Sequence, residues 1–280
     1  MCPPDSRGDF SRQSFLGEHS VERLAAAKVA IVGLGGGGSH IAQQLAHLGV
    51  GHYRLFDPQH IDSSNLNRLV TATAQDVERE AYKADILERT IKAIRPWADV
   101  IRVKNTWQTA QEQLRDAHVI FGCVDGFSAR EALERTARRF LVPYIDIGMS
   151  VTNVTGGYAV GGQVIVSMPG RACMRCIGFL TDERLKREED NYGAAGGVPQ
   201  VVWSNGVLAS TAVGAFVQLL CPWHSGLKET LWLEYDGNSQ QVQWSKQPQY
   251  RIKGPCPHFK SDETGDPFFD ITVAARQVSG

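Results

Sequence analysis

The chain has 280 residues, 42% of them hydrophobic, and a formal net charge of −1. This length allows one large domain or two small ones with a sizeable core, and the near-neutral charge lacks the basic field expected of a protein that binds nucleic acid or a membrane surface. No apolar run approaches the roughly 20 residues that span a bilayer. The six cysteines are too sparse for a disulfide scaffold and the first residues lack a signal-peptide pattern, so we expect a cytoplasmic protein.

The N-terminal arm, residues 1–27, is polar apart from a short predicted helix over 20–27. Arg12 in this arm could contact a phosphate in a neighbouring subunit, although the sequence provides no geometry for such a contact. The alternative is a solvated arm.

A glycine-rich turn follows the predicted apolar strand 28–32 and precedes a helix. Gly33, Gly35 and Gly38 satisfy G-x-G-x-x-G, and Gly36 lies within the motif. Residues without a Cβ allow a backbone turn with positive φ and bring N–H groups close to a phosphate, beside the positive end of the helix dipole. The pattern therefore predicts a nucleotide-binding loop, with simple packing of strand against helix as the alternative.

Asp57 ends the next predicted strand, 52–56. A carboxylate at this place accepts hydrogen bonds from ribose hydroxyls in dinucleotide-binding folds. The alternative is a turn-forming aspartate before Pro58.

The loop 58–68 is polar and contains Asn65, Asn67 and Arg68. It offers more hydrogen-bonding groups than a connector needs, and a dehydrogenase would usually continue soon into a helix. An arginine beside a triphosphate neutralises charge on the transferring or leaving oxygens. The loop therefore favours a triphosphate over a nicotinamide cofactor.

A helix is predicted from about 77 to the stop at Arg95-Pro96. Lys83 lies off its apolar face, where most lysines are solvated. The face is formed by Val77, Ala81, Ala84, Leu87, Ile91 and Ile94.

Strands are predicted over 100–103, 119–121 and 142–147, with a helix over 129–140 between the last two. Asp125 follows the second of these strands, at the end where ligands bind in open α/β sheets, and could hold Mg²⁺ against phosphate oxygens. The alternation predicts a Rossmann-like, doubly wound and mostly parallel sheet.

The sequence pattern of the second half of the chain predicts that antiparallel strands extend the sheet at its C-terminal side. Alternating apolar residues over 150–168 and a hairpin over 230–244 indicate its strands, and 181–191 reads as a charged helix or loop. The apolar helix 203–220 is more typical of a core or a dimer interface than of a membrane.

The ordered set of 29–39, Asp57, 65–68, Lys83 and 123–125 resembles the ThiF/MoeB/HesA family, the adenylating core of ubiquitin-activating enzymes, from about residue 11 to 235. The resemblance implies that the glycine loop and Asp57 hold ATP, that Arg68 and Lys83 contact its phosphates, and that Asp125 organises Mg²⁺. It also implies a homodimer in which Arg12 reaches the partner's ATP site.

The activity implied by the resemblance is adenylation of the C-terminal carboxylate of a ubiquitin-like or sulfur-carrier protein, with release of pyrophosphate. Many members then form a thioester on a cysteine, but this chain has none between Cys176 and Cys221. The enzyme therefore stops at the adenylate, or the acyl group passes to a thiol or hydroxyl of a downstream conjugating or sulfur-transfer protein. The local hydroxyls, Thr181 and Ser204, have no evident base.

Other functions remain open at this point. The adenylated carboxylate could belong to a peptide or to a modified tRNA base, although the missing basic patch argues against tRNA. A binding-only subunit of a heterodimer is a further alternative, but it would have no need of Arg68, Lys83 and Asp125. A nicotinamide dehydrogenase fits the loop after Asp57 least well.

A zinc site is predicted from Cys173-x-x-Cys176, which has the spacing of half a structural site. Near the C-terminus, where the family often has a second C-x-x-C, this chain has Cys256 and His258, and we expect a Cys₃His site. Cys221-Pro-Trp-His224 is a competing second half, and a metal-free pair of buried thiols is the remaining alternative.

The expected organisation is therefore an N-terminal arm (1–27), a ThiF-type adenylation domain (28–260) and a C-terminal tail (261–280). Within the domain, 28–150 would form the nucleotide-binding half and 151–260 the substrate and zinc half.

Overall fold

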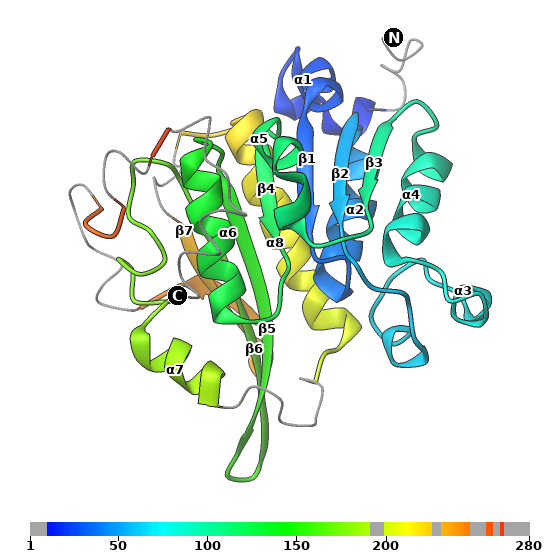
Figure 1. Cartoon of the computed structure of the whole chain (residues 1–280). Helices are drawn as coiled ribbons and strands as arrows, with labels where there is room; N and C mark the ends of the chain where they lie inside the picture. Colours follow the sequence, from blue (N-terminus) through cyan, green and yellow to red (C-terminus); the bar gives the residue numbers. More distant parts are fainter. Residues whose placement is uncertain (1–9, 191–198, 226–230, 247–255, 260–263, 266–280) are drawn as a thin grey trace.

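The computed structural model describes residues 10–190, 199–225, 231–246, 256–259 and 264–265. Its centre is an eight-stranded sheet in the order β3-β2-β1-β4-β5-β6-β7-β8 (Figure 1). The first five strands in this order pair in parallel, and the last three are antiparallel to their neighbours. The strands are β1 (Lys28–Val32), β2 (His52–Phe56), β3 (Asp99–Val103), β4 (Val119–Gly122), β5 (Tyr144–Val154), β6 (Gly157–Ser167), β7 (Leu231–Asp236) and β8 (Gln241–Trp244). The predicted fold class is confirmed.

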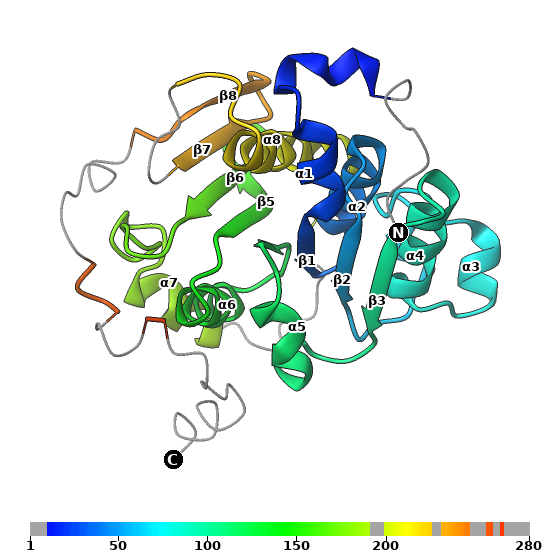
Figure 2. The same ribbon diagram turned by 90° about the horizontal axis from the view of Figure 1, so that it is seen from above.

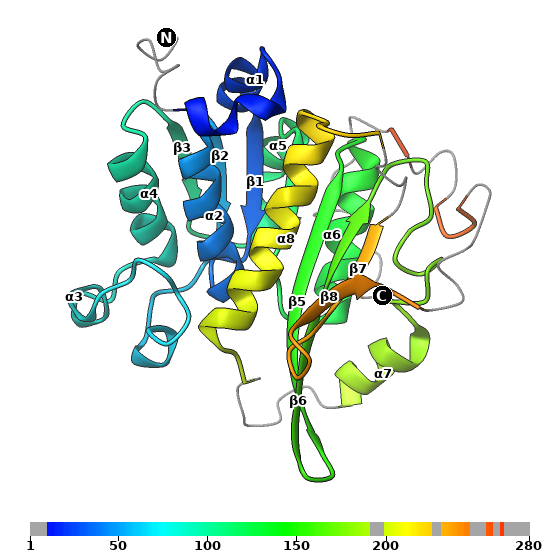
Figure 3. The same ribbon diagram turned by 180° about the vertical axis from the view of Figure 1, so that it is seen from behind.

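Helices cover both faces of the sheet, as Figure 2 shows from above. One face carries α2, α4 and α8, which lie side by side in Figure 3, and the other carries α5, α6 and α7. The helices are α1 (Ser20–Ala26), α2 (Gly36–Leu48), α3 (Ala74–Glu78), α4 (Lys83–Ile94), α5 (Gln111–Arg115), α6 (Phe127–Arg139), α7 (Asp182–Asp190) and α8 (Val202–Leu220), with short 3₁₀ turns η1 (Ser11–Leu16), η2 (Ser63–Asn65) and η3 (Trp107–Ala110).

The core lies on both sides of the central strands. In β1, Ile31 points into the cluster beneath α2, α4 and α8, whereas Val32 belongs to the cluster beneath α6. A strand buried on both faces has no polar alternation, which explains its continuous apolar sequence.

The helix expected over 77–94 is two helices. A capping box between Thr73 and Asp76 begins α3, and the chain leaves helical geometry at Glu80, where φ is 48°. Val77 and Ala81 pack on a separate small cluster with Ile61, Leu69 and Ile86. The apolar residues of α4 (Ala84, Leu87 and Ile91) belong instead to the main core. The apolar spacing continues across the break although the two sides pack on different clusters, so periodicity alone missed it.

Two further boundaries differ from expectation. The strand expected to end at 147 continues without interruption to Val154, because β6 pairs with it along its whole length. The helix expected after the glycine turn begins inside the glycine motif, at Gly36.

By length and composition, α8 is the one helix in the described part of the chain that could cross a membrane, although no apolar run of that kind was expected. Of its most apolar window, 56% is buried inside the protein. It packs against α2, β5 and β6, as the prediction of a core helix requires. The C-terminal tail 261–280 lies, apart from 264–265, outside the described residues.

Candidate nucleotide site and metal centre

A cavity of about 760 Å³ lies where β1, β2 and β4 end. Parallel strands bring their carboxyl ends to one edge of the sheet, so residues that follow separate strands meet there. Most of the predicted site residues line this cavity: Gly33, Gly35, Gly36, Asp57, Asn65, Arg68, Lys83 and Asp125.

The glycines of the loop have different tasks. Gly33 adopts a φ of 89°, which favours glycine. A Cβ on Gly35 would have no neighbour within 4 Å, so this residue leaves open space at the cavity. A Cβ on Gly38 would lie 2.0 Å from the carbonyl oxygen of Gly33. Gly38 is not among the described residues that line the cavity, and its task is the close packing of helix on strand.

Asp57 fastens the glycine loop to the loop that follows β2. Its Oδ2 accepts a hydrogen bond from the amide of Leu34 at 2.8 Å, and its Oδ1 accepts one from the amide of Gln59 at 2.9 Å. The second bond is the turn that the alternative interpretation foresaw. Contact with a ribose stays a prediction.

Asn65 lines the cavity and carries one buried, unpaired acceptor. Its side chain is 4% exposed, and its Nδ2 donates to Asp62 and Ser64. Its Oδ1 is buried without a hydrogen-bond partner among the described residues. The amide of Asn65 therefore holds Asp62 and Ser64 within the loop after β2.

Two cations face the cavity. The guanidinium of Arg68 donates to the carbonyl oxygen of Ser64 at 2.7 Å and to Asn67 at 3.0 Å. Lys83 is buried, and its Nζ donates to Oε1 of Gln59 at 2.6 Å. Because α4 begins at Lys83, its side chain turns into the cavity and is not solvated. The two charges suit a polyphosphate.

The pKa of Asp62, beside this cation pair, lies below its usual range. The main cause is the hydrogen bond from the hydroxyl of Ser64, and the charges of Lys83 and Arg68 add to it. The loop is therefore anionic at Asp62 and cationic at its two basic residues at neutral pH.

Asp125 is exposed at the end of β4, where a carboxylate could bind Mg²⁺. Its Oδ1 accepts a hydrogen bond from Nε2 of Gln200 at 3.2 Å, and the carbonyl oxygen of Gln200 accepts one from Asn67 at 3.3 Å. Gln200 thus spans the cavity from Asp125 to the loop after β2. No sequence pattern had marked it.

Other lining residues were also missed by sequence reasoning. Asn105, Thr106 and Gln108 follow β3 as Asp57 follows β2, so their position after a predicted strand could have marked them as site residues. Arg130 gave no such signal, since it lies within an ordinary helix. The missed residues include Gln59, Asn105, Thr106, Trp107, Gln108, Arg130 and Asn205.

Arg12 lies away from this cavity in its own chain. The neighbouring Gln13 donates to the carbonyl oxygen of Leu48, at the last turn of α2, and Arg12 itself is exposed in η1. The glycine loop is at the other end of α2, a helix about 20 Å long. Arg12 is not among the described residues that line the cavity of its own chain, and its contact with a partner's site stays a prediction.

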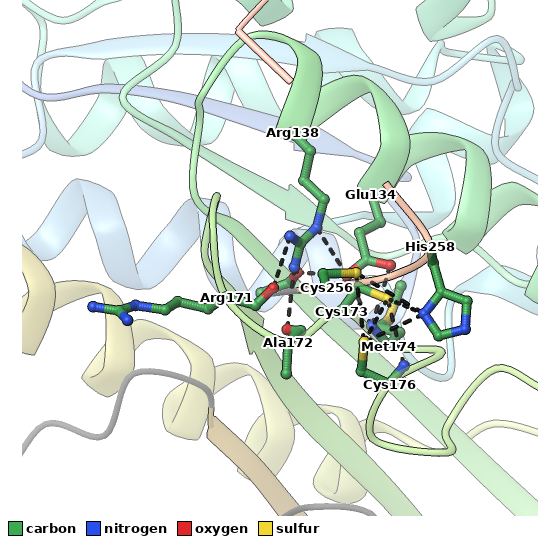
Figure 4. Close-up of polar contacts among 10 residues, drawn as sticks. Glu134, Arg138, Arg171, Ala172, Cys173, Met174, Cys176, Cys256 and His258 are labelled. Carbon is green, nitrogen blue, oxygen red and sulfur yellow. Dashed lines mark hydrogen bonds and ion pairs between the residues drawn. The ribbon is translucent and has the colours of Figure 1, made fainter. Parts of the chain in front are cut away.

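The predicted metal ligands converge (Figure 4). The ligand atoms of Cys173, Cys176, Cys256 and His258 all lie within 4.8 Å of one another. The Sγ atoms of Cys173 and Cys176 are 3.6 Å apart, and Nδ1 of His258 lies 3.3 Å from Sγ of Cys176. These spacings suit the tetrahedral Cys₃His set that Zn²⁺ prefers, although the metal itself stays a prediction. The competing Cys221 is buried in the main core.

A sequence profile of the ThiF family matches residues 10–256. The chain belongs to the ThiF family. Its relatives include the sulfur carrier protein ThiS adenylyltransferase of Escherichia coli, 26% identical over 89% of this chain and 93% of that protein. The corresponding Bacillus subtilis protein is 30% identical over 61% of this chain and 50% of its own length. Rat ubiquitin-like modifier-activating enzyme 5 is 30% identical over 60% of this chain and 44% of its own length. The match therefore spans half or less of the length of the B. subtilis and rat proteins.

Solved structures share the ThiF-family fold. Escherichia coli MccB in complex with ATP superimposes with a TM-score of 0.69 at 19% identity, covering 85% of this chain and 71% of that one. PaaA superimposes with a TM-score of 0.66 at 20% identity, and the superposition covers 88% of this chain and 75% of PaaA. At these identities the likeness establishes the fold alone.

Neither Thr181 nor Ser204 is among the described residues that line the cavity. The side chain of Ser204 is fully buried within α8. The hydroxyl of Thr181 accepts a hydrogen bond from the amide of Arg184 at the start of α7. This agrees with the sequence, which offered no base for either residue.

Proposed function

We propose that this chain is an ATP-dependent adenylyltransferase that activates the C-terminal carboxylate of a small ubiquitin-like or sulfur-carrier protein. The observation that carries the proposal is the convergence on one cavity of the glycine loop with Asp57, Asn65, Arg68, Lys83 and Asp125. The names of the E. coli, B. subtilis and rat relatives support this substrate class.

In the proposed reaction, an oxygen of the carboxylate bonds to the α-phosphorus of ATP, and the bond from that phosphorus to the bridging oxygen breaks. The products are an acyl-adenylate and pyrophosphate. Carboxylate and triphosphate repel each other, so catalysis depends on positioning and charge neutralisation. Arg68 and Lys83 supply cations from the loop and from α4, and Asp125 would hold Mg²⁺, which neutralises phosphate charge when bound.

The test is exchange of labelled pyrophosphate into ATP in the presence of candidate carrier proteins. Asp125→Ala is expected to abolish exchange while the circular dichroism spectrum stays unchanged. A wild-type rate in that variant would refute the role of Asp125. ATP binding without exchange for every carboxylate offered would favour a binding-only subunit.

A peptide carboxylate is the second candidate, because the solved structures of similar fold include MccB with the peptide MccA. The same assay decides between the two classes. Exchange that depends on a short peptide and not on any carrier protein would replace the leading proposal.

We also propose a homodimer in which Arg12 acts on the partner's cavity, because it lies at the far end of α2 from its own. Arg12→Ala and Asp125→Ala should each lack exchange. Mixing them in equal amounts should restore about a quarter of the wild-type sites by statistical reassortment. No recovery after verified subunit exchange would exclude the shared site.

The Cys₃His set uses four protein ligands, which is typical of a structural zinc site with no open position. We therefore propose that zinc stabilises the second half of the domain and takes no part in the chemistry. Because neither Thr181 nor Ser204 is among the described residues that line the cavity, transfer would use a thiol or hydroxyl of a downstream protein. We also propose a cytoplasmic location, because the five cysteines in the described part of the chain form no disulfide with one another.

A further inference from the structure

Helix α6 carries a buried charged stripe that the sequence did not reveal. Arg130, Glu134 and Arg138 follow at intervals of four residues, which places them on one face of the helix. Their exposed fractions are 8%, 1% and 2%. Buried charges are costly unless they are paired and hydrogen-bonded, so each of these side chains should have a defined partner.

The partners of Arg138 are backbone groups just before the Cys173–Cys176 turn. Its Nη1 donates to the carbonyl oxygen of Arg171 at 3.0 Å, and its Nη2 donates to that of Ala172 at 3.1 Å (Figure 4). Nη2 also donates to Oγ of Ser167 at 2.7 Å, at the end of β6. One guanidinium therefore ties two successive carbonyls to the sheet.

Glu134 holds the turn itself. Its Oε1 accepts a hydrogen bond at 2.9 Å from the amide of Met174, which lies between the two cysteines. The same oxygen accepts one from the hydroxyl of Ser167 and lies 3.6 Å from Nε of Arg138. Arg138 and Glu134 thus form one buried unit with Ser167.

A third residue of α6, Glu131, pairs with Arg175 inside the same turn. This pair is partly exposed, with side-chain exposed fractions of 21% and 25%, and Arg175 also pairs with Asp182 at 2.7 Å. Exposed pairs contribute less than buried ones, so we regard Glu131 as a secondary contact.

Helix α6 also contacts the C-terminal segment that carries the ligands Cys256 and His258. The guanidinium of Arg138 lies 5.0 Å from the centre of the Phe259 ring, directly after His258. The ligand pairs Cys173/Cys176 and Cys256/His258 are about 80 residues apart in the chain. Arg138 touches the segments that carry both of them.

We propose that Arg138 and Glu134 are positioning residues of the metal centre, which hold the backbone of 171–174 in the metal-binding conformation. Ligand cysteines whose backbone is already ordered lose less conformational entropy when they bind a metal. Outer partners of this kind typically change metal affinity about 10- to 100-fold. The inference does not depend on the adenylation reaction.

The test measures Zn²⁺ affinity of the full chain by competition with a chromophoric chelator, for Arg138→Met, Arg138→Lys and a matched control. The control is Arg54→Met, because Arg54 is another buried arginine, paired with Asp99 and a backbone carbonyl, on β2 away from the metal centre. The Co²⁺-loaded proteins are compared by visible absorption, which reports tetrahedral thiolate coordination.

Arg138→Met is expected to bind Zn²⁺ about tenfold or more weakly and to lose intensity in the Co²⁺ spectrum, whereas Arg54→Met stays within about twofold of wild type. Arg138→Lys keeps the charge but cannot span both carbonyls, so it should also weaken binding at least about threefold. Wild-type affinity in Arg138→Met, or an equal loss in Arg54→Met, would overturn the proposal. If Arg138→Met does not fold, wild-type affinity in Arg138→Lys overturns it.

Discussion

Arg130 donates through one nitrogen, Nη1, to both carboxylate oxygens of Asp146, at 2.6 and 2.5 Å. Asp146 is fully buried and also accepts hydrogen bonds from the hydroxyl of Tyr144 at 2.9 Å and from Nε2 of Gln163 at 3.3 Å. Burial raises the pKa of Tyr144, which keeps its hydroxyl protonated as a donor. The pair joins α6 to β5 beside the nucleotide cavity, and the charge of Arg130 is already neutralised there.

Asp146→Asn should destabilise the protein by about 3–5 kcal/mol, because it leaves the buried charge of Arg130 without its counter-ion. The free energy of unfolding in urea measures this. The control is Asp116→Asn, which breaks the exposed pair of Asp116 with Lys28 and should cost less than about 1 kcal/mol. Equal losses in the two variants would contradict the assignment of a buried structural pair.

Gly35→Ala and Gly38→Ala should show that one glycine leaves room for the ligand, whereas the other is required for the packing of helix on strand. A methyl group on Gly35 meets no protein atom within 4 Å, so the variant should keep its melting temperature and bind ATP about tenfold more weakly. A methyl group on Gly38 would lie 2.0 Å from a carbonyl oxygen. That variant should lose about 2 kcal/mol or more of stability. Calorimetric titration and thermal melting distinguish them, and wild-type ATP affinity in Gly35→Ala would argue against a nucleotide in this cavity.

Lys83→Met should reduce pyrophosphate exchange about 100-fold or more, because it removes a cation from the phosphate end of the cavity. Lys92→Met is the matched control on the same helix. The ammonium of Lys92 contacts the carbonyl oxygens of Pro96 and Ala98 outside the cavity, so exchange should persist in that variant. Comparable rates for Lys83→Met and wild type would remove Lys83 from the proposed mechanism.

Acid should weaken the protein partly through Asp76. The hydrogen bond from Arg89 is the main reason that the pKa of Asp76 falls from 3.8 to about 2. A carboxyl group whose pKa is lower in the folded state stabilises the fold above its unfolded pKa, and that stability disappears as the pH falls toward the folded value. Because Arg89 is half exposed, the contribution should be about 1–2 kcal/mol.

The matching measurement compares wild type with Asp76→Asn in urea at pH 7, 4 and 2. The variant should be less stable at pH 7, and the difference should shrink between pH 4 and pH 2. A difference that is independent of pH would show that the contribution of Asp76 does not arise from its charge.

Much of the site was predictable because its residues follow local patterns. The glycine loop, Asp57 and Asp125 each come directly after an apolar strand, and the carboxyl ends of parallel strands must meet at one edge. The pair Cys173 and Cys176 was recognisable from its spacing. The choice of Cys256 and His258 as the second half rested on the family resemblance, and Cys221 with His224 stayed open until the structure was known. The glycine loop, Asp57, Asp125 and the Cys173–Cys176 spacing depend on neighbours in the chain, so the sequence alone sufficed to find them.

Other features depended on where the elements end and how they pack. Helical periodicity alone left Lys83 off the apolar face, and only the structure places this first residue of α4 at the cavity. The register of β5 against β6 likewise prolonged a strand beyond its apolar segment. Gln200 was placed by its contacts with Asp125 and Asn67, which lie far away in the chain.

By itself, the sequence determined the order of strands and helices, the glycine turn and the set of reactive residue types, since backbone preference and side-chain chemistry are local properties. Only the tertiary structure decided which buried charges neutralise one another. Asp146 on β5 neutralises Arg130, and the carbonyls of 171 and 172 hold Arg138; no sequence spacing predicts these contacts. The i,i+4 spacing of Glu134 and Arg138 places that pair on one face of α6 but does not predict its burial. The cost of burying a charge depends on the groups that surround it in space, and packing brings those groups together from distant parts of the chain.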